Sequence, residues 1–312
     1  MKILYIDPVV RSETSRKYKY YDGVFDELCK ENQVYLCRNI PDDIKKYSEY
    51  INFKPDIVIF GLGWFNHRYF KKINNIDCPS LCILFKPQND LQEKLNFCKI
   101  NNISRILTPV PDYKSYEKET GIETILFPYG FNPHVFKQRG TTKKYDIGFS
   151  GALHQSKLYP KKAFQTEDLR TKIGEILSSL QDVKVFWNSS DNAQTAFIDS
   201  YEEYANTISE SKMWIATQAA YGDVTPRFYE VLGSGTLLVC QQIPEAYKFL
   251  LKDNHNCVEF SNDLHNFKEK VYYYVNNPEE ITRITKNALE SFHNKWTWKH
   301  RADQLIKIAK EI

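Results

Sequence analysis

The feature that most constrains this chain is a regular alternation of short apolar segments with longer amphipathic ones. The apolar segments in the first part are Lys2–Ile6, Gln33–Cys37, Asp56–Phe60, Ser80–Phe85, Arg105–Thr108 and Thr124–Pro128. Those in the second part are Tyr145–Phe149, Val183–Trp187, Met213–Thr217, Thr236–Cys240 and Cys257–Phe260. Helical patterns lie between them, at Asp22–Lys30, Leu91–Cys98 and Asp168–Leu180. Alternation of this kind predicts βαβ units and parallel sheets covered on both faces.

A polar stretch without apolar periodicity, Lys137–Lys144, interrupts the alternation and indicates a linker. The chain has 312 residues, about twice a typical domain. We therefore predict an α/β protein with two doubly wound domains, residues 1–136 and 145–295, joined by 137–144. Residues 296–312 hold a last helix with Ala302, Leu305, Ile306 and Ala309 on one face. Ligands of such sheets bind beyond the carboxyl ends of the strands, so a cleft between the domains is the expected site.

Composition limits the classes of partner. The chain has 42 Lys and Arg against 39 Asp and Glu, a net charge of +3, which gives no strong signal for nucleic acid. The seven cysteines include no C-x-x-C pair and are expected to be free thiols of a reducing compartment. The first residues are too short an apolar run for a signal peptide, so we expect a cytoplasmic protein. Peripheral membrane contact and the oligomeric state stay open.

The most informative segment runs from Met213 to Cys240, where a predicted strand leads through a loop into a short helix. Thr225 suits the capping position of this helix, and Pro226 suits its first turn. The positive helix end together with Arg227 forms an anion site. Glu230, one turn later on the same face, could accept hydrogen bonds from ribose hydroxyls. The alternative is an ordinary helix cap with an intrahelical Arg–Glu pair.

A second segment ends the strand Tyr145–Phe149 with Ser150-Gly151, where a missing side chain lets backbone N–H groups approach a ligand. Arg170, expected in the first turn of the helix Asp168–Leu180, could direct its guanidinium at the same phosphates. The alternatives are a common strand–glycine turn and a solvated surface arginine.

Several motifs, in this order along the chain, resemble those of group 1 glycosyltransferases of the GT-B superfamily. Thr225–Val239 resembles the core "R-x-F-E-A-x-A-x-G", and Pro128–Phe136 is similar to "P-x-G-x-D-P-x-x-F". The other matching stretches are Pro55–Val58, Asp146–Gly151 and the closing Asn277–Glu280, Phe292, Trp296–Trp298 and Arg301. The greatest similarity is to the spore-coat-type branch of the superfamily.

The resemblance implies two facing Rossmann-like domains, a sugar nucleotide bound mainly by the second, and a last helix that returns to the first. It assigns Glu230 to the ribose, Arg227 to the basic position beside it, and Gly151 to the phosphate approach. Many retaining members carry another glutamate where this chain has Gly222, and the neighbouring Asp223 is the candidate replacement. Retention is favoured over inversion on the resemblance alone. The expected donor is a UDP- or GDP-linked sugar, with no further cofactor.

Two features of the first domain are candidates for the acceptor side. Asp90, after the strand Ser80–Phe85 with Lys86 and Asn89, is either a general base or the cap of the helix Leu91–Cys98. The segment after the first strand, Arg11 to Tyr21, intersperses basic residues with tyrosines. It could bind an acceptor glycan, a phosphate or a single-stranded nucleic acid, and the alternative is a solvated loop. Gly61-Leu62-Gly63 lacks the rest of a dinucleotide fingerprint and is expected to be a tight turn before Trp64-Phe65.

The predicted function is transfer of a sugar from a nucleotide sugar to a glycan or another hydroxyl acceptor. No Asp-x-Asp triplet occurs and the histidines lack metal-ligand spacing, so no bound metal is expected. Two alternatives remain: a degenerate GT-B protein that binds a sugar nucleotide without turnover, for which Gly222 is the main support, and a glycosyltransferase that modifies DNA bases. The net charge of +3 disfavours the latter.

Overall fold

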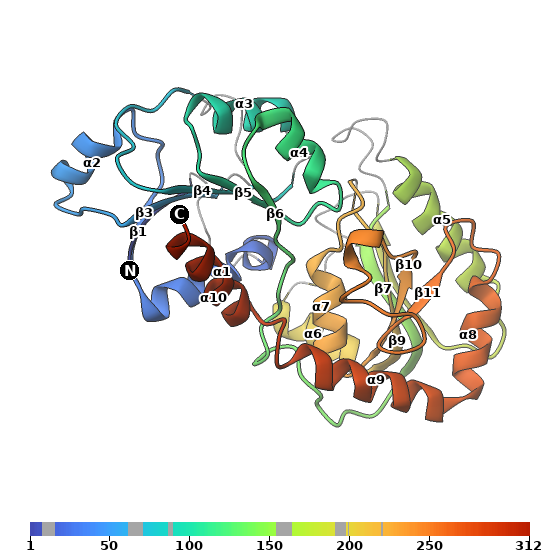
Figure 1. Ribbon diagram of the computed structural model, residues 1–312. Coiled ribbons are helices and arrows are strands. Elements are labelled where there is room, and N and C mark those ends of the chain that lie inside the picture. Colours follow the sequence, from blue (N-terminus) through green and yellow to red (C-terminus); the bar gives the residue numbers. More distant parts are fainter. Residues whose placement is uncertain are drawn as a thin grey trace. The chain divides into compact units, whose positions relative to one another are not determined.

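The computed structural model describes residues 1–7, 16–61, 71–86, 90–153, 164–190, 198, 200–219 and 221–312, and in 16–22, 164–168 and 190 the backbone only. The chain divides into two compact units (Figure 1). Unit 1 comprises Met1–Pro128 and Trp298–Ile312, and unit 2 comprises Tyr129–Thr297. Each unit contains one parallel sheet, so the α/β class and the doubly wound architecture are confirmed.

Unit 1 has a six-stranded parallel sheet in the order β2-β1-β3-β4-β5-β6. Its strands are β1 (Lys2–Ile6), β2 (Gln33–Cys37), β3 (Ile57–Gly61), β4 (Ser80–Ile83), β5 (Arg105–Thr108) and β6 (Thr124–Leu126). Its helices are α1 (Arg16–Glu31), α2 (Ile44–Tyr50), α3 (Leu91–Ile100), α4 (Tyr113–Thr120) and α10 (Trp298–Lys310). Helices α3 and α4 cover one face of the sheet, and α1 and α10 pack together on the other (Figure 1).

The last helix of the chain belongs to unit 1 because it packs tightly on α1. A Cβ atom built on Gly23 would lie 2.2 Å from Cδ1 of Trp298, so only glycine lets the two helices approach this closely. Lys299 adds an ion pair to Glu31 at 2.8 Å. The buried face of α10 includes Ala302, Leu305 and Ala309 as predicted, whereas Ile308 is buried where Ile306 was expected.

Unit 2 has a five-stranded parallel sheet in the order β11-β10-β9-β7-β8. Its strands are β7 (Tyr145–Ala152), β8 (Val185–Ser190), β9 (Ser211–Ala216), β10 (Leu237–Gln241) and β11 (Val258–Phe260). Its helices are α5 (Phe164–Ser178), α6 (Tyr201–Ser209), α7 (Pro226–Gly233), the short 3-10 helix η3 (Glu245–Tyr247), α8 (Phe267–Asn276) and α9 (Pro278–Phe292). One core of aliphatic and aromatic side chains joins this sheet to α5, α8 and α9.

The segment predicted as a linker lies within unit 2 and is bonded to α6 and its end. The guanidinium of Arg139 donates to Glu202 at 2.6 Å and to Asn206 at 2.8 Å. Nζ of Lys143 donates to the carbonyl of Ser209 at 2.8 Å. Lack of apolar periodicity indicated a free connector, but polar residues can also fix a segment through hydrogen bonds. The division between the units lies at Pro128 instead.

Two helix starts differ from their predictions. Helix α1 begins at Arg16, so the basic and aromatic residues Arg16–Tyr21 are helical and do not form a loop. Helix α5 begins at Phe164, four residues before the predicted start. Arg11, Asn89 and the residues Leu62-Gly63 of the predicted turn lie outside the described residues.

None of the seven cysteines, all of which lie in described parts of the chain, forms a disulfide bond, as predicted. A bilayer-spanning helix is absent from the described part of the chain, where none of the helices combines enough length with a continuous apolar surface.

Candidate functional site

The strand order of unit 2 locates a site before any side chain is considered. Strands β8 and β9 lie on opposite sides of β7, so the order reverses between β7 and β9. In open parallel sheets, the loops leaving two such strands diverge and leave a crevice at their carboxyl ends, where ligands bind. Strand β7 ends with Ser150-Gly151-Ala152, and Thr217 follows β9. The predicted Ser-Gly element therefore lies at the switch point of the sheet.

Arg170 bridges this switch point. Its Nη1 donates to the carbonyl of Ala152 at 2.7 Å, and its Nε donates to Oγ1 of Thr217 at 2.8 Å. Because α5 starts at Phe164, Arg170 lies in its second turn and not in the first, which corrects the prediction. The two bonds hold the guanidinium across the ends of β7 and β9 and place a fixed positive charge at the switch point.

Arg227 is the second cation at the end of β7. It is only 9% exposed, and its Nε donates to the hydroxyl of Tyr204 at 3.1 Å. Its guanidinium carbon lies 5.7 Å from the centre of the Phe149 ring, which favours a cation over the ring face. A Cβ atom at Gly151 would lie 3.5 Å from both Nη1 and Nη2 of Arg227. This is an ordinary contact distance, so both terminal nitrogens of Arg227 lie beside the backbone at Gly151.

Helix α7 begins at Pro226, so Arg227 lies in its first turn. Thr225 occupies the capping position with extended backbone angles and Pro226 the first turn, as predicted, but the hydroxyl of Thr225 makes no capping hydrogen bond. The predicted side-chain cap is therefore wrong. The positive end of the helix dipole is not neutralised by this hydroxyl, which suits an anion better than the capped arrangement would.

Two buried hydroxyl groups of this region have no hydrogen-bond partner among the described residues. They are Oγ of Ser150 and Oγ1 of Thr225. Buried polar atoms in folded proteins are nearly always hydrogen-bonded, so each unsatisfied one calls for an explanation. A polar ligand at the switch point would supply the missing partners for both.

Glu230 is 1% exposed, one turn after Arg227 on α7, where every residue is buried. Its Oε1 accepts a hydrogen bond from the hydroxyl of Tyr201 at 3.1 Å. Arg227 and Glu230 are thus each bonded to a tyrosine of α6. Tyr201, Tyr204 and Thr217 were missed by the sequence analysis, since only the tertiary packing brings them to the site.

Asp223 lies on the turn that precedes α7 and is buried. Its carbonyl accepts from the amide of Ala219 at 3.1 Å, and the amide of Gly222 donates to the carbonyl of Ala219 at 2.9 Å. Gly222 has φ of 76°, a left-handed conformation that favours glycine. The turn therefore gives a structural reason for glycine at the position where the resemblance led us to expect a glutamate.

Asp90 in unit 1 precedes α3, but its side chain makes no capping hydrogen bond, so that alternative is wrong. Its backbone is left-handed, with φ of 53°, as is that of Lys86, with φ of 54°. Lys94, one turn into α3, is 0% exposed, and its Nζ donates to the carbonyl of Lys86 at 3.0 Å. Burial lowers the pKa of Lys94 to about 8, while Cys82 and Asp90 oppose this shift.

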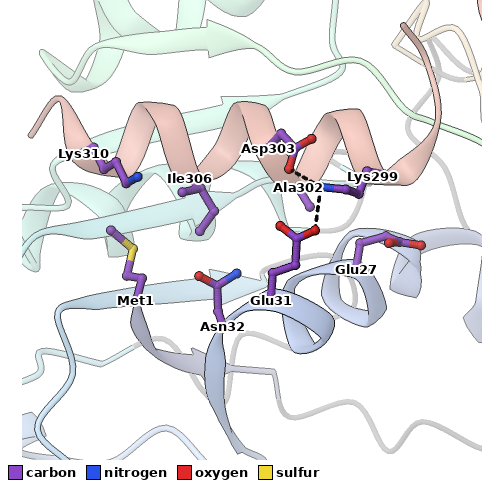
Figure 2. Close-up of a pocket in the computed structure, with 9 residues that line it drawn as sticks. All are labelled: Met1, Glu27, Glu31, Asn32, Lys299, Ala302, Asp303, Ile306 and Lys310. Carbon is purple, nitrogen blue, oxygen red and sulfur yellow. Dashed lines mark hydrogen bonds and ion pairs between the residues drawn. The ribbon is translucent and has the colours of Figure 1, made fainter. Parts of the chain in front are cut away.

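A surface pocket of unit 1, of about 330 Å³, lies between α1 and α10 (Figure 2). Lys299 contacts Glu31 at 2.8 Å and Asp303 at 2.9 Å within it. Met1 and Asn32 line the pocket just before β1 and β2, so it lies at the amino ends of these strands. Ligands of parallel sheets bind at the opposite ends, and the pocket contains none of the predicted site residues.

Part of the chain matches a known protein family in sequence. Residues 166–307 match the model of a family described as glycosyl transferase-like, and nearly all of this stretch lies in unit 2. No curated protein matches the chain in sequence.

Similar solved structures span the whole chain. A sucrose-phosphate synthase from Thermosynechococcus elongatus has a TM-score of 0.66 and 13% identity, covering 99% of this chain and 98% of that one. A glycosyltransferase from Rickettsia africae has a TM-score of 0.61 and 13% identity, with the same coverage. HepE of Anabaena in complex with UDP-glucose has a TM-score of 0.61 and 10% identity, covering 100% of both chains. The likeness to these structures confirms the predicted GT-B fold.

Proposed function

We propose that this chain, which has the GT-B fold and a glycosyl transferase-like region at residues 166–307, transfers a sugar from a nucleotide sugar to a hydroxyl acceptor. The observation that carries the proposal is the convergence of Arg170 and Arg227 on the end of β7. Two guanidinium groups, a helix start and two unsatisfied hydroxyls suit a diphosphate better than a single carboxylate. HepE, a structural neighbour, was solved with UDP-glucose, and the donor proposed here is likewise UDP- or GDP-linked.

In this proposal, the leaving diphosphate gains negative charge as the bond to the sugar breaks. Arg227 and the amino end of α7 stabilise that charge, and Arg170 adds a second cation from the ends of β7 and β9. These donors are already held by the protein, so little reorganisation is needed when the charge develops. Gly151 lets the phosphates approach the backbone, and Ser150, Thr225 and Pro226 belong to the same site.

Glu230 accepts hydrogen bonds from the ribose in this proposal, since a buried carboxylate suits hydroxyl donors. Asp223 is proposed as the contact to the donor sugar, in place of the glutamate found in related enzymes. Asp90 of unit 1 is proposed as the base toward an acceptor hydroxyl, a group that an inverting displacement uses. Retention, which the resemblance favours, would not require it. The transfer is proposed to need no bound metal, and the acceptor is a glycan or another hydroxyl compound.

A panel of UDP-, GDP- and dTDP-sugars tests the proposal. At least one donor should raise the unfolding temperature and be hydrolysed slowly or transferred to a glycan acceptor, with EDTA leaving the rate unchanged. NMR of the product then gives the anomeric configuration. If no sugar nucleotide shifts the unfolding temperature, the transferase proposal is wrong. Binding without hydrolysis or transfer to any acceptor would instead indicate a degenerate binding protein.

A further inference from the structure

Helix α6 carries Tyr201 and Tyr204, one turn apart. Helix α7 carries Arg227 and Glu230, also one turn apart, and each of these contacts one of the two tyrosines. Tyr204 is fully buried and accepts from Nε of Arg227, while Tyr201 donates to Oε1 of Glu230. The pairs are matched along the two helices. Each functional side chain of α7 therefore has its own hydroxyl partner on α6.

Tyr204 determines how the guanidinium of Arg227 is turned. Its oxygen accepts the Nε proton, while the guanidinium carbon lies over the ring of Phe149, 5.7 Å from the ring centre. These two contacts restrict the position of the group. The edge formed by Nη1 and Nη2 then faces Gly151, with both nitrogens equally distant from its Cβ position. This edge binds phosphate oxygens bidentately, so its direction determines whether a diphosphate can be bound.

Tyr201 determines how the carboxylate of Glu230 is oriented. A tyrosine hydroxyl has a single proton, and here it is donated to Oε1. This bond removes rotational freedom from a carboxylate that is almost completely buried. A ribose hydroxyl is a weak and directional donor, so it needs an acceptor whose position is already fixed.

Helix α6 is itself held on both sides. The ring of Phe136 packs edge-on against Tyr201 at 4.9 Å and Tyr204 at 6.0 Å between ring centres. Arg139 binds Glu202 and Asn206 on the same helix. The amino end is capped by Ser200, whose hydroxyl accepts from the amide of Glu203 at 2.9 Å. The two tyrosine hydroxyls are therefore presented from a rigid support.

We propose that Tyr201 and Tyr204 are positioning residues with separate tasks: Tyr204 aligns Arg227 for the diphosphate, and Tyr201 aligns Glu230 for the ribose. The inference rests on the proposed function of the site. It predicts that removing either hydroxyl changes recognition of one part of the nucleotide and leaves the other part unaffected. A merely structural role would weaken all ligands by the same factor.

The test measures dissociation constants of UDP, uridine and 2′,3′-dideoxy-UDP, or of the guanosine series if the protein selects GDP. Tyr204→Phe should weaken UDP about tenfold and uridine less than twofold, since uridine lacks the phosphates. Tyr201→Phe should weaken UDP about tenfold and 2′,3′-dideoxy-UDP less than twofold, since the latter lacks both ribose hydroxyls. Tyr274→Phe is the matched control, because it removes a buried hydroxyl of α8 that donates to Asn254 at 2.8 Å. It should leave all three constants unchanged.

The outcomes distinguish a failure of the separate tyrosine tasks from a failure of the proposed function. If both variants weaken all three ligands by one common factor, or weaken none, the separate tasks are refuted while the proposed function stands. If the wild-type protein binds neither series, the proposed function is wrong and this inference is wrong with it. Unfolding temperatures of the three variants show whether each remains folded under the conditions of the binding measurement.

Discussion

The described residues at the switch points of the two sheets differ in charge. In unit 2 the crevice between β7 and β9 is bridged by Arg170, and Arg227 approaches the end of β7. In unit 1 the order reverses between β1 and β3, where Asp7 follows β1 and Gly61 ends β3. A Cβ atom at Gly61 would lie 3.1 Å from Oδ2 of Asp7, so a carboxylate lies beside the end of β3.

This contrast indicates that the fold provides a crevice, whereas the side chains decide which ligand the crevice accepts. Unit 1 does have a cation beyond the end of β4, Lys94, but it is completely buried and its ammonium donates to the carbonyl of Lys86. Arg170 and Arg227 also bond to their own chain, yet five N–H groups allow a guanidinium to do so and still bind phosphate. We therefore propose that the anion binds in unit 2.

The largest effect is expected from the two functional residues of α7. Arg227→Ala and Glu230→Ala should each weaken nucleotide diphosphate binding about a hundredfold, or about 3 kcal/mol, because each removes a buried group that the ligand contacts. Calorimetry with UDP or GDP measures the loss. Asp7→Asn, the corresponding change in unit 1, should alter the same constant less than twofold. Unchanged affinity in both α7 variants would refute the site.

A smaller effect, on stability, is expected from Lys94. Its pKa is lowered to about 8 from an unfolded value of 10.5, so below pH 8 the folded protein bears a cost of about 3 kcal/mol for the buried charge. That cost decreases as pH rises from 8 to 10.5. In this range Lys94 is deprotonated in the folded protein and still protonated in the unfolded chain, so raising the pH favours the folded state.

Lys94→Met should therefore stabilise the protein by about 2 kcal/mol at pH 7, after the loss of the hydrogen bond to Lys86. Above pH 10.5 the same variant should be less stable than the wild type by about 1 kcal/mol. Denaturant unfolding at several pH values measures both. Lys99→Met, an exposed change on the same helix, should show the same increase in the free energy of unfolding with pH as the wild type. If this increase persists in Lys94→Met, a group other than Lys94 causes it.

The smallest effect is expected at Arg170. Arg170→Gln should weaken UDP or GDP binding about fivefold, or about 1 kcal/mol, because Arg227 and the end of α7 still stabilise the phosphates. Thr217→Val removes one of the two bonds that hold the guanidinium but retains its charge, and should cost less than Arg170→Gln. Equal losses in the two variants would mean that orientation, and not charge, is what Arg170 contributes.

Several features of the fold could be predicted because their signals are local. Apolar runs such as Lys2–Ile6 and Arg105–Thr108 gave strand bounds that the structure reproduces. Helix starts were predicted less accurately. Arg16–Tyr21 and Phe164–Glu167 were expected outside helices, since residues of the first turns need not be apolar. The polar Lys137–Lys144 stretch shows the same limit. Its hydrogen bonds to α6 join residues more than 60 positions apart, and no local pattern records such a partner.

The two parallel sheets, the Ser-Gly end of β7 and the spacing of Arg227 and Glu230 by one turn could be predicted from the sequence, because these depend on residue types at short spacing. The groups that orient Arg227 and Glu230 could not, because they follow from the packing of the folded chain. Tyr204, Tyr201 and Thr217 come from α6 and the end of β9, and they reach Arg227, Glu230 and Arg170 across 23, 29 and 47 positions of the chain. A hydrogen bond depends on distance and direction in space, and only packing establishes both for residues so far apart.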